Sequence, residues 1–228
     1  TLDRSSAASD VYKRQMINYT PFGHSDWQTI VSDIKKFGMA GKKTAVVSTI
    51  NGDANVPFYK ELGNQGIKAE DIPVVAFSVG EEELSGFDTS PLVGHLAAWN
   101  YFMSAESDIN DAFIEDWLKF IKDDKRVTND PMEAHVNGFE MYVKAVEKAG
   151  TTETMKVVEA LESGISQDGP SGVVTMDPKS HHGSHTIFLI EVGKGHKVSI
   201  PKIWKDIKPY WLGESGCDLA NKADYSQY

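Results

Sequence analysis

The amino-acid sequence predicts an α/β fold in which a parallel sheet carries helices on its faces. Two β-branched runs, 43–50 and 72–77, alternate with two stretches of helical period, 24–38 and 56–67. Because each helix returns the chain to the start of the next strand, this alternation favours parallel strands. With 228 residues and 40% hydrophobic side chains, the chain is long enough to bury a sizeable core, as one large domain or as two small lobes.

The helix expected at 24–38 has one apolar face, because its large side chains recur at steps of three and four. Those side chains are Trp27, Ile30, Val31, Ile34 and Phe37. Ser25 or Asp26 is the expected N-cap, and Gly38 is the expected stop. In the second helix Pro57 suits the first turn, and a glycine closes the pattern.

Three further helices are predicted at 107–124, 131–150 and 151–164. The side chains expected to turn inward are Ile109, Phe113, Trp117 and Ile121 on the first, and Met132, Val136, Phe139, Val143 and Val146 on the second. Asp130-Pro131 marks the start of the second of these helices, and Gly150 marks its end. The middle of the chain is therefore expected to be mainly helical.

The last part of the chain is predicted to be antiparallel β structure. One strand ends at a turn marked by Asp177-Pro178, and a second runs from Thr186 to Val192. A Gly-Lys-Gly turn then leads into a third strand that ends near Trp204. Residues 205–228 are polar and weakly patterned, so we expect a tail of low order.

Composition and motifs argue against several function classes. Lys and Arg number 23 against 33 Asp and Glu, a formal charge of −10, and no basic run could follow a nucleic-acid backbone. No window approaches ~18 consecutive apolar residues, so membrane insertion is not expected. Nucleophile and phosphate-binding motifs are absent, so we expect neither an enzyme nor a cofactor. For His181, His182 and His185, loop packing is favoured over a metal site.

The most distinctive pattern is the abrupt change to polar residues at the ends of two predicted strands. Asn51-Gly52-Asp53 follows one strand, and Ser78-Val79-Gly80-Glu81 follows the next. In an open α/β sheet, small ligands bind in a crevice beyond the carboxyl ends of parallel strands. The pattern is therefore typical of a mouth for a small polar ligand, although ordinary turns explain it equally well. Among Glu81, Glu82 and Glu83, at least two are expected to be solvated surface charges.

Five segments resemble one family of binding proteins. They are "NGDANVPFYKELGNQGI", "DIPVVAFSVGEEELSG", "LVGHLAAWNYF", "TNDPMEAHVNGFEMYVKAVEKAG" and "GPSGVVTMDPKSHH". In this order, from about Tyr19 to Val192, they resemble the urea-binding branch of the branched-chain amino-acid type substrate-binding proteins, which also includes short-chain amide binders. The resemblance implies a periplasmic or cell-surface binding protein of an ABC transporter that delivers urea or a short amide to permease subunits.

The resemblance also implies a partial type I periplasmic binding protein fold, a three-layer α/β/α arrangement with hinge strands. Residues 16–95 would form the second lobe, which binds the ligand, and 96–168 the returning helical part of the first lobe. Residues 169–204 would supply a hinge strand and the terminal β-hairpin of the second lobe, and 205–228 the tail. Residues 1–15 have no helical or strand period and are typical of translated adaptor sequence. The opening α/β unit of the first lobe, and a signal sequence, are expected to be missing.

By the same resemblance, the residues assigned to the cleft are Asn51, Asp53, Ser78, Glu81, Trp99, Tyr101 and Glu133. Urea offers one carbonyl acceptor and several N–H donors, so a selective site needs both acceptors and donors. Asp53 and Glu81 can accept hydrogen bonds from its nitrogens. Asn51 and Ser78 can donate to its oxygen. Trp99 or Tyr101 can cover its plane, although Trp99 suits hinge packing equally well.

Two alternative functions stay open. One is a branched-chain amino-acid-binding protein, whose ligand needs partners for an ammonium and a carboxylate group together with an apolar pocket. The strand exits of this sequence offer little that is apolar. The other is an amide-sensing regulatory receptor domain, which would be joined to signalling segments.

Overall fold

The computed structural model of the protein describes residues 15–41, 43–85 and 88–209. Its helices and strands belong to one compact unit, Pro21–Pro209. The segment predicted to derive from an adaptor, apart from its last residue, and the predicted tail beyond residue 209 lie outside the described residues.

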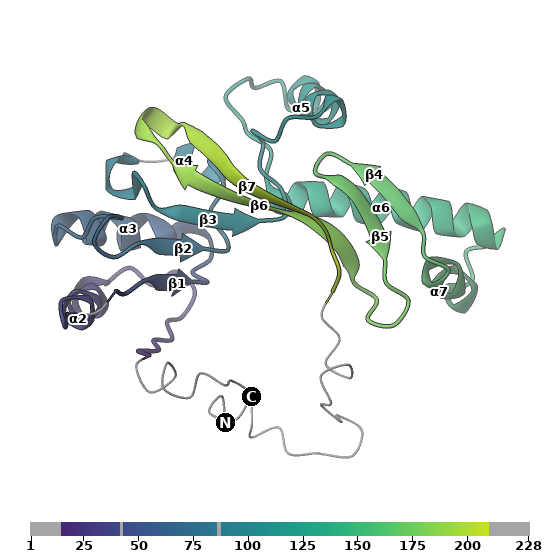
Figure 1. Cartoon of the computed structure of the whole chain (residues 1–228). Helices are drawn as coiled ribbons and strands as arrows, with labels where there is room; N and C mark the ends of the chain where they lie inside the picture. The colour runs from purple at the N-terminus through teal and green to yellow at the C-terminus, as the bar shows by residue number, and fades with distance from the viewer. Residues whose placement is uncertain (1–14, 42, 86–87, 210–228) are drawn as a thin grey trace, which may run out of the picture. The chain divides into compact units, whose positions relative to one another are not determined.

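The predicted parallel strands form one half of a mixed sheet. β1 (Val46–Ser48), β2 (Val74–Ala76) and β3 (Leu96–Trp99) are parallel neighbours. β6 (Gly183–Val192) pairs with β3 in the antiparallel sense, and β7 (Val198–Ile207) pairs antiparallel with β6 (Figure 1). The α/β prediction and the antiparallel hairpin at the end are both confirmed.

Two helices accompany the parallel strands and provide much of the first hydrophobic core. These are α2 (Gln28–Gly38) and α3 (Asn55–Asn64), and the short helix α4 (Glu81–Ser85) follows β2. The first core consists of Trp27, Val31, Ile34, Ala54, Phe58, Tyr59, Leu62, Ile67, Ile72, Val74, Ala76, Val79, Leu84, Leu92, Ala97, Phe102, Ala105, Phe188, Ile190 and Val192. Its members come from helices and from the sheet, as in other layered α/β units.

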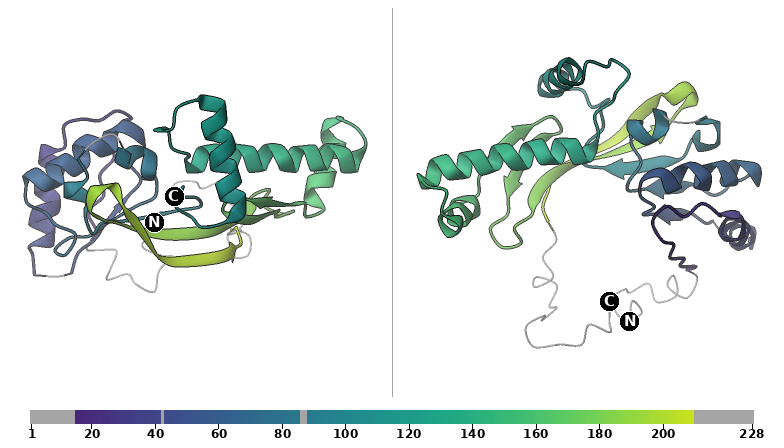
Figure 2. Two further views of the ribbon diagram at one scale, coloured as in Figure 1. Left: turned by 90° about the horizontal axis from the view of Figure 1, so that it is seen from above. Right: turned by 180° about the vertical axis from the view of Figure 1, so that it is seen from behind.

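The middle of the chain forms a second, smaller core. The helices of this region are α5 (Asp108–Ile121), α6 (Asp130–Ala149) and α7 (Thr154–Glu162), and α6 and α7 contribute residues to the core. Helix α6 runs along the hairpin of β4 (Ser166–Gly169) and β5 (Gly172–Met176), and α7 packs beside α6 (Figure 2). The second core consists of Met141, Ala145, Val157, Ala160, Ile165 and Val174.

Strand β6 is long enough to take part in both groups of strands. Its residues from Phe188 to Glu191 pair with β3, whereas Gly183 and Ser184 pair with β5. Strand β7 accompanies β6 over most of this length, with His185 opposite Ile207 at the far end. The two cores are therefore joined by a continuous antiparallel ribbon.

The predicted inward face of α6 is wrong at Val136 and Phe139, whereas Val146 does pack against the second core. The residues of α6 that the structure buries are Asp130, Glu133, Asn137, Met141 and Ala145, whereas Val136 and Phe139 are exposed. The first half of the helix turns polar side chains toward neighbouring loops, and only its second half reaches the second core. Ile109 on α5 is also exposed rather than inward.

Two predicted boundaries differ from the structure, and several hold. Helix α2 begins after Trp27 with no side-chain cap, so neither Ser25 nor Asp26 is the N-cap, but Gly38 does end it. Helix α6 begins at Asp130 behind an Asn129 cap and ends before Gly150, as expected apart from the cap itself. Strand β7 runs on to Ile207, beyond the predicted end near Trp204, because pairing with β6 orders polar residues that carry no strand period.

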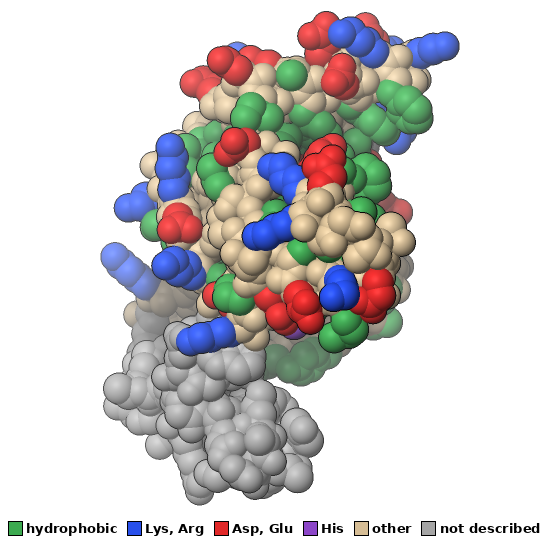
Figure 3. All heavy atoms as spheres, turned by 90° about the vertical axis from the view of Figure 1, so that its right-hand side faces the viewer, with side chains coloured by type: hydrophobic (Ala, Val, Ile, Leu, Met, Phe, Trp, Pro, Cys, Tyr) green, Lys and Arg blue, Asp and Glu red, His purple; other side chains and the backbone are tan. Residues whose placement is uncertain are grey.

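Hydrophobic side chains reach the surface around the second core. Figure 3 shows one face of the molecule, on which hydrophobic side chains lie between acidic and basic ones. Exposed large hydrophobic residues include Phe120 on α5, Phe139 and Tyr142 on α6, Met155 on α7 and Val173 on β5. Within the described ranges, none of the helices combines the length and the apolar composition that crossing a bilayer requires.

Candidate ligand-binding site

The polar segments that follow β1 and β2 lie next to each other. The two strands are parallel with Val46 opposite Val74, so their carboxyl ends meet at the same edge of the sheet. Ser78, just beyond β2, donates its hydroxyl to the carbonyl oxygen of Ile50, just beyond β1, at 2.6 Å. The expected neighbourhood of the two strand exits is confirmed, and the Ser78 hydroxyl joins them directly.

The turn after β1 is held by a residue that the sequence patterns did not single out. Asn55 is buried at the start of α3, and its side-chain amide donates to the carbonyls of Ile50 at 2.9 Å and Gly52 at 3.2 Å. These bonds fix the turn while Asn51 and Asp53 keep exposed side chains. An asparagine in the first turn of a helix, directly after a polar turn, is the signal that could have identified it.

Each of the three successive glutamates has a hydrogen-bond partner. Glu81 Oε1 accepts from the backbone N–H of Ser104 at 2.9 Å and from its hydroxyl at 2.7 Å. Glu82 accepts from the side-chain amide of Asn129, and Glu83 accepts from the backbone N–H of Gly80 at 2.8 Å. Glu82 is exposed, and Glu81 and Glu83 are half-buried. The charges of Glu81 and Glu82 therefore lie at the surface as expected, but segments distant in sequence return to this edge and bond to them.

Burial of Glu83 affects its protonation. Burial raises the pKa of the Glu83 carboxyl, the hydrogen bond from Gly80 opposes that shift, and the charges of Glu82 and Glu81 add to it. Glu83 caps the start of α4 in the manner of a capping box, with its side chain reaching back to the residue before the helix. Its role is therefore to hold the turn that presents Glu81.

The two aromatic residues assigned to the cleft have different environments. Trp99 is partly buried against the first core, and its ring lies beside Gly80, where an added Cβ would stand 3.8 Å from the ring. Tyr101 is buried, and its hydroxyl lies 2.8 Å from Asn110 Oδ1 and 2.6 Å from Thr128 Oγ1. Burial also raises the pKa of Tyr101. Trp99 therefore borders the strand exits, whereas Tyr101 anchors the segment that leads into α5.

Glu133 is buried inside the molecule rather than at the strand exits. Its Oε1 accepts from the hydroxyl of Ser171 at 2.6 Å and from the side-chain amide of Asn137 at 2.7 Å. Its Oε2 has no hydrogen-bond partner among the described residues. Glu133 thus ties α6 to the turn between β4 and β5, and a ligand role for it stays a prediction that this packing does not favour.

Asp130, one turn before Glu133, performs a similar task. Its Oδ2 accepts from the backbone N–H of Asn100 at 3.0 Å, in the segment between β3 and α5. Burial, with a smaller effect from the charge of Glu133, raises the pKa of Asp130 to about 7. The start of α6 therefore bonds to the segment after β3 and to the turn between β4 and β5.

At the edge formed by the strand exits, the exposed and half-exposed groups are Asn51, Asp53, Glu81 and Trp99. They offer carboxylate acceptors, one side-chain amide and an aromatic face. Ser78 lies behind them and is already engaged with Ile50. Such a set can bind a small polar molecule by hydrogen bonds and can cover one of its faces.

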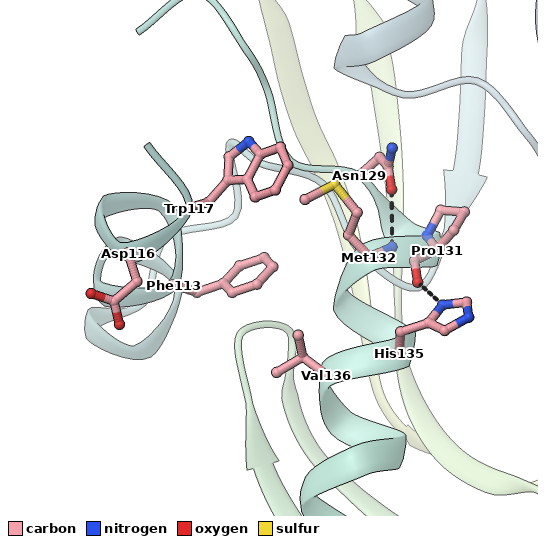
Figure 4. Close-up of a pocket in the computed structure, with 8 residues that line it drawn as sticks. All are labelled: Phe113, Asp116, Trp117, Asn129, Pro131, Met132, His135 and Val136. Carbon is pink, nitrogen blue, oxygen red and sulfur yellow. Dashed lines mark hydrogen bonds between the residues drawn. The ribbon is translucent and has the colours of Figure 1, made fainter. Parts of the chain in front are cut away.

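A separate hollow lies between α5 and α6. It has a volume of about 670 Å³ and is lined by Phe113, Asp116, Trp117, Asn129, Pro131, Met132, His135 and Val136. Figure 4 shows Phe113 on α5 directed toward Met132 and Val136 on α6, with His135 Nδ1 bonded to the carbonyl of Pro131. None of the residues assigned to the cleft from the sequence lines this hollow.

The histidines near the β5–β6 turn are placed apart from the strand exits. His181 Nε2 lies 2.9 Å from Glu162 Oε1 on α7, and His185 lies within β6. Among the described residues, the His, Cys, Asp and Glu side chains form no group of three or more that could hold a metal ion.

The architecture is that of a type I periplasmic binding protein, of which this chain contains a part. The chain has parallel strands with polar exits, a helical portion and a continuous ribbon between two cores. Residues 4–209 match the family model described as periplasmic binding protein domain, so the chain belongs to that family.

Similar proteins carry names from solute transport. The chain is 28% identical over 177 residues to the "Leu/Ile/Val-binding protein homolog 6" of Brucella melitensis, covering 76% of this chain and 44% of that protein. A solute-binding protein of an ABC transporter from R. palustris, solved in complex with 4-hydroxybenzoate, aligns with a TM-score of 0.72 and 22% identity over 84% of this chain and 52% of that chain.

A third similar protein has a title that names several amino acids. The leucine-, isoleucine-, valine-, threonine- and alanine-binding protein from Brucella ovis, in a closed conformation, aligns with a TM-score of 0.69 and 16% identity. That alignment covers 83% of this chain and 50% of the solved one. The chain therefore spans about half the length of the relatives it matches, and the predicted fold is confirmed.

Proposed function

We propose that the protein binds a small solute for an ABC transporter and passes it to permease subunits outside the cytoplasm. The observation that carries this proposal is the polar edge formed by the exits of β1 and β2, at the place where α/β sheets bind small ligands. Family membership supports it, because the similar proteins are solute-binding proteins by name. The proposal assigns the protein no catalytic step.

The ligand we propose is urea or a short-chain amide. Asp53 and Glu81 provide acceptors for amide nitrogens, and Asn51 provides a donor for the carbonyl oxygen. The ring of Trp99, beside Gly80, can cover a planar ligand. Ser78 supports the site from behind by holding the two exits together. A neutral ligand fits this edge because the carboxylates there would repel an anionic group.

A branched-chain amino acid is the second candidate, and the names of the relatives favour it. Its ammonium group could pair with Asp53 or Glu81. Its carboxylate would need donors that are free, yet the hydroxyls of Ser78 and Ser104 already bond within the chain. A preference for leucine would therefore require those bonds to rearrange.

Isothermal titration calorimetry on the protein in its natural length decides between these ligands. We expect saturable heat with urea or acetamide at lower concentrations than with leucine or 4-hydroxybenzoate. Tight leucine binding without any urea heat would overturn the amide proposal. No binding of any of these solutes would count against a solute-binding function.

One variant tests the role of Glu81 in that binding. Glu81→Ala should weaken urea binding at least about tenfold, or about 1.5 kcal/mol, because ligand donors would lose their acceptor. Glu140→Ala, which removes an exposed carboxylate from α6, is the matched control and should leave the affinity unchanged. An unaltered affinity in Glu81→Ala would remove this residue from the site.

A further inference from the structure

The start of α6 makes three polar contacts, two of which join it to segments of the first core. Asn129 contacts Glu82 on α4, Asp130 contacts the backbone at Asn100, and Glu133 contacts Ser171. Helix α4 belongs to the first core through Leu84, whereas the later half of α6 belongs to the second core. A change in the arrangement of the cores must therefore keep or break the contacts of Asn129 and Asp130.

The three contacts differ in their access to water. Asp130 and Glu133 are buried, so breaking their bonds would leave polar groups without partners in the interior. The bond between Glu82 and Asn129 lies at the surface, where water can replace either partner. Of the three, it is the contact that can open and close repeatedly.

A second hydrogen bond, at the cap of α6, orients the Asn129 side chain for its bond to Glu82. Its Oδ1 caps α6 by accepting from the backbone N–H of Met132 at 2.9 Å. With the oxygen held in the cap, the nitrogen of the same amide is directed to Glu82, and Figure 4 shows the cap bond on Asn129. The helix cap, rather than Glu82, therefore fixes the direction in which the Asn129 amide nitrogen donates.

We infer that Glu82 and Asn129 form a latch that positions α4, and with it the neighbouring Glu81, against the helical part of the molecule. Both are positioning residues, because neither belongs to the polar edge that contacts solute in the proposed function. The use of the latch in solute binding rests on that function. The latch itself requires only the two residues and the cap.

The orientation of the amide permits a test in which donor and acceptor are exchanged. Asn129→Asp keeps the helix cap, since aspartate is as good an N-cap as asparagine, but places a second carboxylate against Glu82. Adding Glu82→Gln to that variant restores a bond of reversed polarity, because the glutamine amide can donate to the new carboxylate.

A matched control is available on α3. Asn64 Nδ2 donates to Glu61 Oε2 at 3.1 Å, so it makes the same kind of amide–carboxylate bond within a single helix of the first core. Asn64→Asp changes the net charge by the same amount as Asn129→Asp. It should not alter the arrangement of the two cores.

Pulsed electron spin resonance can measure that arrangement without any ligand. Spin labels are attached at Lys60→Cys on α3 and Lys156→Cys on α7, in the protein of natural length with Cys217→Ser. We expect Asn129→Asp to broaden the distance distribution and shift its mean, and the double variant to restore it. Asn64→Asp should match the parent. An unchanged distribution in Asn129→Asp, or a double variant that stays as broad as the single one, would overturn the latch.

A kinetic measurement connects the latch to binding and keeps the two proposals separable. If the solute found by calorimetry dissociates several-fold faster from Asn129→Asp and at the parental rate from the double variant, the latch serves closure around the solute. An unaltered dissociation rate would overturn that use. If no solute binds but the label distances respond as expected, the solute-binding function fails and the latch stands.

Discussion

The two hydrophobic cores differ in how completely the described chain covers them. The first core has helices and strands around it and includes fully buried side chains such as Phe58, Leu62 and Ile190. The second is small, and apolar residues on its helices, including Phe139 and Met155, face outward. Apolar side chains that stay exposed forfeit roughly 1.5–3 kcal/mol of burial each. We therefore expect the first core to provide most of the stability.

The largest expected effect contrasts one phenylalanine from each region. Phe58→Ala should lower the free energy of unfolding by about 3–5 kcal/mol, because it removes a side chain that is 1% exposed and leaves a cavity. Phe139→Ala, at a residue 63% exposed, should change it by less than about 0.5 kcal/mol. Urea or guanidinium denaturation followed by circular dichroism measures both. Equal losses would mean that the outer face of α6 is covered after all.

The first core should lose stability in acid because of His95. Its Nδ1 accepts from the backbone N–H of Val74 at 2.9 Å, and burial lowers the pKa of His95 from 6.5 to about 4. The unfolded chain therefore takes up the proton first, and stability falls as the pH drops from about 6.5 toward 4. The loss should reach about 2–3 kcal/mol.

The variant His95→Asn keeps an acceptor for Val74 without an imidazole, so it should remove that part of the pH dependence. Denaturation curves collected between pH 4 and pH 7.5 on both proteins make the comparison. If the difference in unfolding free energy between them does not change with pH, the buried imidazole is not the cause of acid sensitivity.

The start of α6 should show the opposite dependence on pH. The pKa of Asp130 in the folded protein is about 7, above its ordinary value of 3.8. The folded state therefore retains the proton longer, and stability is lost as the pH rises from about 4 to about 7. Asp130→Asn still accepts from Asn100, so it should be more stable than the parent by about 2–4 kcal/mol at pH 8 and equal at pH 4.

Thermal or chemical denaturation of Asp130→Asn at those two pH values provides the check. A variant that is less stable than the parent at pH 8 would mean that the ionised carboxylate is the form that holds Asn100. His95 should make the first core less stable in acid, whereas Asp130 should make the start of α6 less stable at alkaline pH. The opposite signs therefore distinguish the two regions.

The polar edge could be predicted from the sequence, whereas the face of α6 could not. Asn51 and Ser78 each follow a β-branched run, and parallel pairing alone brings such exits together. Helix α6 carries an apolar stripe through Val136 and Phe139 and a second stripe through Glu133 and Asn137 at the same period. The polar stripe is buried because Glu133 bonds to Ser171, which lies far along the chain. The local sequence of α6 does not indicate such a partner.

The environment of the glutamates after β2 could not be predicted from the local sequence either. Their run of negative charge is typical of a solvated turn, because partners such as Ser104 and Asn129 are distant in sequence. Tyr101 was assigned to the cleft by resemblance, yet its hydroxyl bonds to Asn110 and Thr128 in the interior. In each case, hydrogen bonds to residues distant in sequence determine where the side chain lies.

The most direct test of the account is to locate the solute at the exits of β1 and β2. Nuclear magnetic resonance spectra of the ¹⁵N-labelled protein in its natural length can be titrated with urea at millimolar concentrations, well below denaturing ones. We expect saturable shifts of the backbone amide signals of Gly52, Asp53, Gly80 and Glu81, while signals along α7 stay in place. Saturable shifts confined to the hollow between α5 and α6, or no saturable shift with urea, acetamide or leucine, would contradict a binding site at this edge.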